Sequence, residues 1–195
     1  GAVGHAPPSA APAATQGLAL AWNHSLVQLI ERLGDDGLAL ARQLAMTTYR
    51  SELDFAGRFG RQREADGRFS VSSYLGYQVT KLLSRFDRDT YRTLVRVMDG
   101  HDIGRDRGGV LAALRSLAEA GAALTGLGIA GDILYGPDQV TRLVSDAEAA
   151  GVRAAYRELR SGKGHDAFLI EWEQLTAILR EALEPALVAV ESGAA

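Results

Sequence analysis

The chain has 195 residues, of which 47% are hydrophobic and 23% are charged, and its net charge at pH 7 is −3. This length suffices for one domain with a core, or for a domain with an appendage, and the small negative charge gives no reason to expect nucleic acid or an anionic membrane as a partner. The chain contains no cysteine, which excludes disulfides, thiolate catalysis and cysteine-ligated metals, and no apolar run approaches the ~20 residues that span a bilayer.

The first 17 residues are rich in alanine and proline and predict an irregular segment. They lack the basic region and the continuous apolar core of a secretory signal. A cytoplasmic protein is therefore expected.

Residues 18–109 predict four amphipathic helices and no strand. Apolar residues recur at spacings of three and four, and Gly34 fits the C-terminal cap of the first helix. The predicted helices span residues 18–33, 37–50, 70–83 and a stretch capped by Asp87 or Asp89, and residues 51–69 and 101–109 predict loops, the former with at most one helical turn. Arg105 and Arg107 in the last loop fit an anion site, or, with more weight, a solvated loop.

The pattern changes after residue 110. A helix is predicted over residues 110–120, followed by a short apolar strand over 122–129, a helix over 137–150, a second strand over 152–159 and a final helix over 167–183. This alternation of strands and helices is typical of a parallel α/β sheet. The chain as a whole is nevertheless mostly α-helical.

An acid and a histidine follow the two predicted strands. Asp132 comes after the first strand, and His165 comes after the second, in a glycine-rich loop before Phe168, Leu169 and Trp172, which are expected to dock the last helix. Each residue alone fits a capping or hydrogen-bonding role. Functional groups gather beyond the carboxyl ends of parallel strands, however, so the two together favour catalysis, with the carboxylate orienting the imidazole and the imidazole taking a proton from a nucleophile.

No nucleophile completes this pair. In α/β-hydrolases the catalytic residues follow the order nucleophile, acid, histidine, and no serine of this chain lies in a G-x-S-x-G elbow; Ser116 and Ser161, for example, do not. Two parallel strands also do not make an independent sheet. The sequence therefore predicts the C-terminal part of a larger enzyme, either a fragment or one subunit of a split protein, with the serine on a missing N-terminal half.

Arg42 and Tyr49 lie seven residues apart on the second predicted helix and so share one face. From these residues alone, an exposed arginine and a half-buried tyrosine are the simpler interpretation.

Several segments together resemble the homoserine O-acetyltransferase family. They are YRSELDFAGRFGR at 49–61, YLGYQVTKLLSRFDRDTYRTLVRVMDGHD at 74–102, GDILYGPDQ at 131–139 and GHDAFL at 164–169, and HDIGRDRGG at 101–109 is similar to actinobacterial members. The resemblance covers most of residues 37–171. Several motifs in the right order are more specific than any one of them.

The resemblance implies an α/β-hydrolase fold with an inserted helical lid domain. It divides the chain into an irregular segment at 1–17, the lid at 18–109 and the C-terminal part of the hydrolase core at 110–195. It also implies a homodimer formed through the lid helices.

The resemblance further implies a function in methionine biosynthesis. An upstream serine would be acetylated by acetyl-CoA, a co-substrate rather than a bound cofactor, and would pass the acetyl group to homoserine, with Asp132 and His165 as the acid and base of the triad. Arg42 and Tyr49 match positions that line the homoserine site, and Asp166 matches one that binds the amino group. A guanidinium suits a carboxylate and an aspartate suits an ammonium group. No metal is implied.

Other functions stay open. The acyl donor could be succinyl-CoA, or the acyl acceptor could be another hydroxyl compound. A third alternative is that the acyl group is transferred to water, as in an α/β-hydrolase. A non-enzymatic alternative is a helical dimerisation module. In every catalytic version the chain alone is expected to be inactive, because it lacks the nucleophile.

Overall fold

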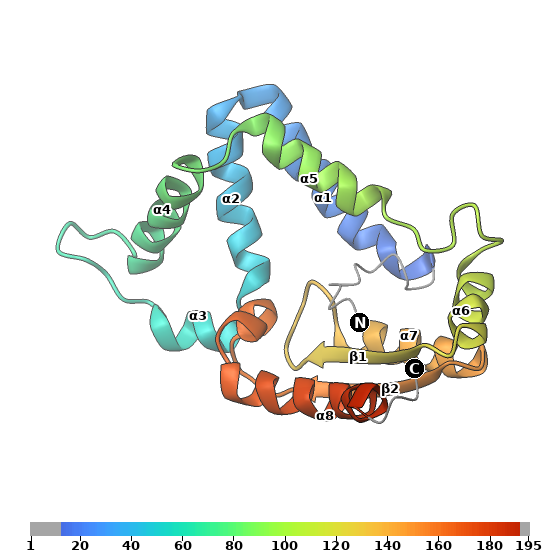
Figure 1. Ribbon diagram of the computed structural model, residues 1–195. Coiled ribbons are helices and arrows are strands. Elements are labelled where there is room, and N and C mark those ends of the chain that lie inside the picture. Colours follow the sequence, from blue (N-terminus) through green and yellow to red (C-terminus); the bar gives the residue numbers. More distant parts are fainter. Residues whose placement is uncertain (1–12, 192–195) are drawn as a thin grey trace.

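The computed structural model describes the backbone of residues 13–191 and the side chains of residues 17–184. In chain order its elements are α1 (Ala13–Leu33), α2 (Asp35–Tyr49), α3 (Glu52–Arg58), α4 (Ser70–Leu83), α5 (Arg88–Gly100), α6 (Val110–Glu119), β1 (Ala123–Ile129), α7 (Pro137–Ala149), β2 (Arg153–Leu159), the 3₁₀ helix η2 (Gly164–Leu169) and α8 (Trp172–Glu191). Figure 1 shows the helices α1, α2, α4 and α5 on one side of a layer that contains both strands.

The predicted helices and strands are confirmed, apart from shifts of one or two residues at some ends and three larger differences. The first helix begins at Ala13 rather than at residue 18, because alanine favours helix even beside a proline-rich stretch; the rest of the predicted irregular segment, residues 1–12, lies outside the described residues. The second difference is α3, where the sequence predicted one helical turn at most. Ser51 caps this helix by accepting a hydrogen bond from the backbone N–H of Asp54 at 3.1 Å, so the described lid region contains five helices rather than four.

The third difference lies at the C-terminal end of the chain, where a helix was predicted from residue 167. A 3₁₀ helix and then α8 occupy this stretch, and Leu169 and Trp172 are 53% and 61% exposed. They do not dock the helix as predicted, because a 3₁₀ helix has three residues per turn and an α-helical apolar stripe does not continue through it. Ala167 is buried instead, and Phe168 packs beside it.

The lid helices share a core of their own. Its buried residues are Leu26, Ile30, Leu38, Ala41, Ala45 and Leu82, and Trp22, Tyr49, Phe86 and Tyr91 pack against them. Within this core α1 packs along α2, and α4 and α5 close it from either side. Tyr49, at the C-terminal end of α2, therefore lies at the edge of the lid core.

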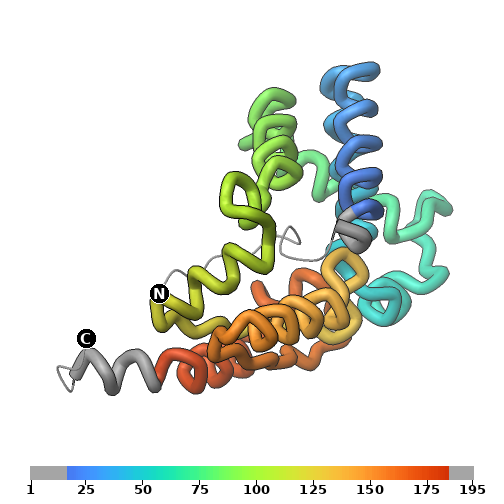
Figure 2. The backbone as a smooth tube through the Cα atoms, turned by 90° about the vertical axis from the view of Figure 1, so that its right-hand side faces the viewer, coloured from blue at the N-terminus to red at the C-terminus, as the bar shows by residue number. Residues whose placement is uncertain are grey.

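The two strands are parallel, as predicted, with Ala123 opposite Arg153 and Ile129 opposite Leu159. One face of the sheet packs on α7 and the other on α8 and η2, so the lower layer of Figure 1 is a sheet between helices. Figure 2 shows α1 and α5 rising away from this layer. Gly126 allows α7 to approach closely: a Cβ atom there would lie 2.6 Å from a methyl carbon of Val144. Both strands end at the same edge, beside the C-terminal end of α2.

Candidate active site

Asp132 lies in the turn that follows β1, and its carboxylate is held on both sides. One oxygen, Oδ1, accepts hydrogen bonds from the backbone N–H groups of Leu134 and Tyr135, at 2.8 and 3.0 Å. The other oxygen, Oδ2, lies 2.9 Å from Nδ1 of His165. The side chain of Asp132 is only 3% exposed, so its orientation is fixed by these contacts.

His165 reaches this carboxylate from η2, after the second strand. Its side chain is 13% exposed. Because Nδ1 faces Asp132, the other ring nitrogen, Nε2, lies on the side of the ring away from the carboxylate. This is the arrangement in which a carboxylate fixes the tautomer of a catalytic histidine and the second nitrogen exchanges protons with a substrate or nucleophile. The structure thus brings together the two residues predicted as acid and base.

Three aromatic rings surround the imidazole. The ring centroids of Tyr49, Tyr135 and Phe168 lie 5.8, 5.4 and 5.6 Å from that of His165. Burial raises the pKa of Tyr49, with the Arg42 charge opposing and the Asp166 charge adding to the rise, and burial likewise raises the pKa of Tyr135. Both hydroxyls therefore stay protonated at neutral pH and do not act as competing bases.

Tyr49 faces the histidine from α2, and Arg42 lies beside Tyr49 on the same helix. The guanidinium carbon of Arg42 lies 5.7 Å from the ring centroid of Tyr49, and one terminal nitrogen lies 3.4 Å from the side-chain oxygen of Gln78. Its Nε is buried and has no hydrogen-bond partner within the described residues. The predicted shared face is thus confirmed.

Asp166 follows the histidine and forms an ion pair with Arg50, in which Oδ2 lies 3.2 Å from Nε. Its charge also acts on Tyr49. The five predicted site residues therefore lie on three segments: Arg42 and Tyr49 on α2, Asp132 in the turn after β1, and His165 and Asp166 on η2.

Sequence reasoning missed three residues at this site. Tyr135 follows Asp132 within the same turn, and an aromatic residue beside a predicted catalytic acid was the available signal. Arg50 and Ser51 lie within a segment that carried the family resemblance, but only their contacts with the loop of His165 show what they do.

No group of three or more histidine, cysteine or acidic side chains that could hold a metal ion occurs among the described residues. Within the same part of the chain, no helix is long and apolar enough to cross a bilayer.

Solved structures show the class of protein to which this geometry belongs. A homoserine O-acetyltransferase from Bacillus anthracis, 15% identical, superposes with a TM-score of 0.73 over 88% of this chain and 49% of that one. Esterase E22, 14% identical, gives a TM-score of 0.72 over 86% and 50% of the two chains. The fold is that of the α/β-hydrolases.

Sequence comparison narrows the class. No family model matches the chain. A homoserine O-acetyltransferase from Moorella thermoacetica is 39% identical over 155 residues, which are 76% of this chain and 41% of the relative, and one from Thermus thermophilus is 43% identical over 143 residues, 73% and 34% of the two. The structure of the Staphylococcus aureus homoserine O-acetyltransferase is 29% identical, with a TM-score of 0.64 over 86% and 47% of the chains.

The chain belongs to the homoserine O-acetyltransferase family. It spans less than half the length of the relatives that it matches.

Proposed function

We propose that this chain supplies the acid, the base and the acceptor-binding residues of an O-acyltransferase that moves an acyl group from acetyl-CoA to the hydroxyl of homoserine. The observation that carries the proposal is the 2.9 Å contact between Asp132 and His165 beside Arg42 and Tyr49. The nucleophile would be a serine on a part of the protein that precedes this chain. Methionine biosynthesis and a cytoplasmic location are part of the same proposal.

The reaction would proceed in two half-reactions that both use His165. In the first, Nε2 takes the proton of the serine hydroxyl as it attacks the thioester, and gives it to the departing thiolate of CoA. In the second, Nε2 takes the proton of the homoserine hydroxyl as it attacks the acyl-serine, and returns it to the serine oxygen. Asp132 stabilises the imidazolium that forms in each half-reaction.

Arg42 and Asp166 would hold the acceptor. The guanidinium of Arg42 suits the carboxylate of an amino acid, and Asp166 suits its ammonium group. The charges of Arg42 and Asp166 both act on Tyr49, and a nearby pair of opposite charges favours an acceptor that carries both a carboxylate and an ammonium group.

A further part of the protein is expected beside the sheet. In the described residues the sheet has two strands, each with an unpaired edge. Parallel sheets of two strands are not stable alone, because both faces and both edges need cover. A serine-bearing segment that adds strands would both complete the sheet and bring the nucleophile to its carboxyl edge.

We also propose a homodimer formed through the lid. Large apolar side chains on its helices are exposed, among them Leu40, Leu44, Leu94, Val97 and Met98. Sedimentation velocity of the full-length protein should show a dimer that Val97→Glu weakens. A full-length protein that stays monomeric at all accessible concentrations would contradict this part of the proposal.

The central experiment incubates the full-length protein with acetyl-CoA, with and without homoserine, and follows thiol release and O-acetylhomoserine. Thiol release that requires homoserine and yields the ester supports the acyltransferase. Thiol release that ignores homoserine supports a hydrolase, the second candidate, which the structural likeness to an esterase favours. Succinyl-CoA in place of acetyl-CoA tests the donor.

A further inference from the structure

Resting on the proposed function, we infer that Arg50 and Ser51, which join α2 to α3 and are here called the α2–α3 junction, are positioning residues for the acceptor half-reaction. They would hold the histidine turn, residues 161–166, in register with α2. In this way the lid helix that carries Arg42 would be fixed relative to the loop that carries Asp166.

The first observation is a direct contact of backbone on backbone. Gly164 has a φ of +72°, and a Cβ atom there would lie 2.6 Å from the backbone N of Ser51 and 2.9 Å from the carbonyl carbon of Arg50. Any other residue would be strained at this φ and would also push the two segments apart. The backbone of the histidine turn at Gly164 thus lies in direct contact with the backbone of the α2–α3 junction, with no room for a side chain between them.

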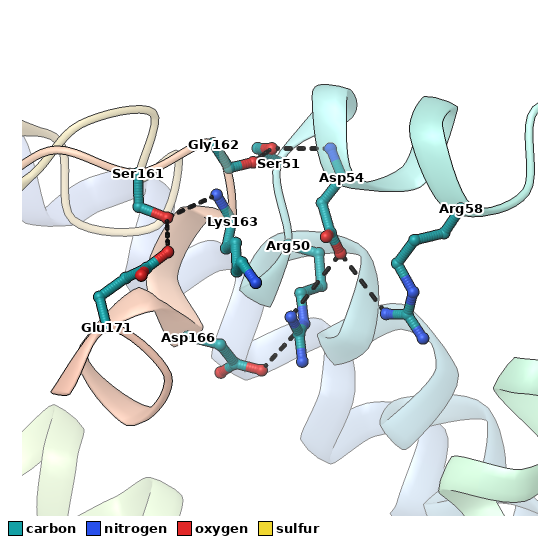
Figure 3. Close-up of polar contacts among 9 residues, drawn as sticks. All are labelled: Arg50, Ser51, Asp54, Arg58, Ser161, Gly162, Lys163, Asp166 and Glu171. Atoms are coloured by element: carbon teal, nitrogen blue, oxygen red, sulfur yellow. Dashed lines mark hydrogen bonds and ion pairs between the residues drawn. The ribbon is translucent and has the colours of Figure 1, made fainter.

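The second observation is a hydrogen bond across this contact. The hydroxyl of Ser51 donates to the carbonyl oxygen of Gly162 and accepts from the backbone N–H of Asp54 (Figure 3). Ser51 and Asp132 are the two buried polar or charged residues in the described part of the chain. One buried hydroxyl therefore caps α3 and anchors the histidine turn at the same time.

The third observation is the place of Arg50 between two carboxylates. Its guanidinium lies 3.2 Å from Asp166 and 3.7 Å from Asp54, which also pairs with Arg58 at 3.5 Å (Figure 3). The side chains of Arg50 and Asp166 are each 18% exposed, so the pair is partly shielded from water. The 3.2 Å approach is an ion pair without hydrogen-bond geometry, so the opposite charge of the guanidinium is what restrains the carboxylate of Asp166.

The histidine turn is also fixed from its other end. The hydroxyl of Ser161 donates to Glu171 at 2.8 Å and accepts from the backbone N–H of Lys163 at 3.1 Å. These contacts lie within the core part of the chain. The contacts of Ser161 do not fix the position of the histidine turn relative to the lid. The α2–α3 junction does.

Arg50 and Ser51 are therefore expected to affect the two half-reactions differently. Loss of Arg50 would release Asp166 but leave the Asp132–His165 contact in place, so it should impair binding of an acceptor ammonium and spare the donor half-reaction. Loss of the Ser51 hydroxyl would loosen the turn that carries His165 and should slow both half-reactions.

The test uses the full-length protein with Arg50→Gln, Arg50→Lys and, as the matched control, Arg88→Gln, which breaks an exposed lid ion pair with Asp35. Arg50→Gln should raise the homoserine KM up to about tenfold, less than the loss of a charged contact itself, because Asp166 stays in place but is no longer restrained. It should leave thiol release in the donor half-reaction unchanged, as should the control. Arg50→Lys should restore part of the loss, because it keeps the charge without the planar fork.

An acceptor without an amino group separates positioning from general damage. 4-Hydroxybutanoate, which is homoserine without its ammonium, should be used equally well by wild type and Arg50→Gln. Equal losses for both acceptors, or an unchanged or lower homoserine KM, would overturn the role of Arg50. For Ser51, Ser51→Ala should slow both half-reactions and Ser51→Thr should restore them; full activity of Ser51→Ala would overturn its role.

The outcomes also separate this inference from the function on which it rests. A wild-type protein that transfers no acyl group to homoserine overturns both. If the wild type is active and Arg50→Gln leaves the homoserine KM unchanged, only the positioning role is overturned.

Discussion

The change Asp132→Asn tests how the carboxylate controls His165. Oδ1 accepts two backbone N–H groups, at 2.8 and 3.0 Å, so the amide oxygen of an asparagine must take that place. The opposite orientation would leave both partly buried N–H groups facing an NH₂ group, at a cost of about 1 kcal/mol or more for each. The asparagine NH₂ therefore points at Nδ1, 2.9 Å away in the wild type.

A donor in this place reverses the tautomer of the histidine. Nδ1 must then accept, the ring proton moves to Nε2, and Nε2 can no longer take a proton from serine or homoserine. The same change in a serine-protease triad lowers kcat about 10⁴-fold, which corresponds to about 5 kcal/mol of transition-state stabilisation.

The assay measures both half-reactions of the full-length protein, and imidazole ¹⁵N NMR reports the tautomer. Asp89→Asn, which makes the same charge change at an exposed side chain of the lid, is the control. It should leave the rates of both half-reactions and the tautomer of His165 unchanged. A loss of less than about tenfold in both half-reactions, or an unchanged tautomer, would refute the reasoning.

Three further predictions concern binding, pH and packing. Arg42→Ala should raise the homoserine KM by about tenfold or more and spare the first acylation, as measured by thiol release; a defect in thiol release alone would contradict its role. Burial holds the pKa of Tyr49 above its ordinary value of 10.0, so the stability it contributes is full below pH ~10 and is lost as pH rises further. The melting temperature of Tyr49→Phe should therefore fall less than that of the wild type above about pH 10. Melting temperatures that fall equally with pH in both proteins would count against this. Gly126→Ala should cost about 1–3 kcal/mol in urea unfolding, because its Cβ would meet Val144 at 2.6 Å, whereas Gly76→Ala, with open space around it in α4, should be neutral or stabilising; equal effects would refute the packing argument.

The sequence predicted those features that depend on short spacings. Periods of three and four located the lid helices, and a glycine-bounded apolar run located β1, because each pattern reports which side of a local element is buried. Asp132 and His165 were predicted to meet because the carboxyl ends of parallel strands share an edge, and the 2.9 Å contact confirms this.

The features that the sequence could not predict are contacts between distant segments. Ser51 bonds to Gly162, 111 residues away, and no periodicity around either residue reports the other. The ion pair between Arg50 and Asp166 is of the same kind, and so is the docking of Phe168, which depends on a 3₁₀ helix rather than on an α-helical stripe. Burial patterns identify a buried side, but not the segment that covers it. The division of the chain at residues 17 and 109 stays a prediction.

The most direct test of the account is intact-protein mass spectrometry of the full-length protein after incubation with acetyl-CoA. The account predicts one acetyl group on a serine outside this chain, its removal by homoserine with formation of O-acetylhomoserine, and no acetyl group in His165→Ala. Acetylation that persists in His165→Ala, or an acetyl group that homoserine does not remove from the wild type, would contradict it.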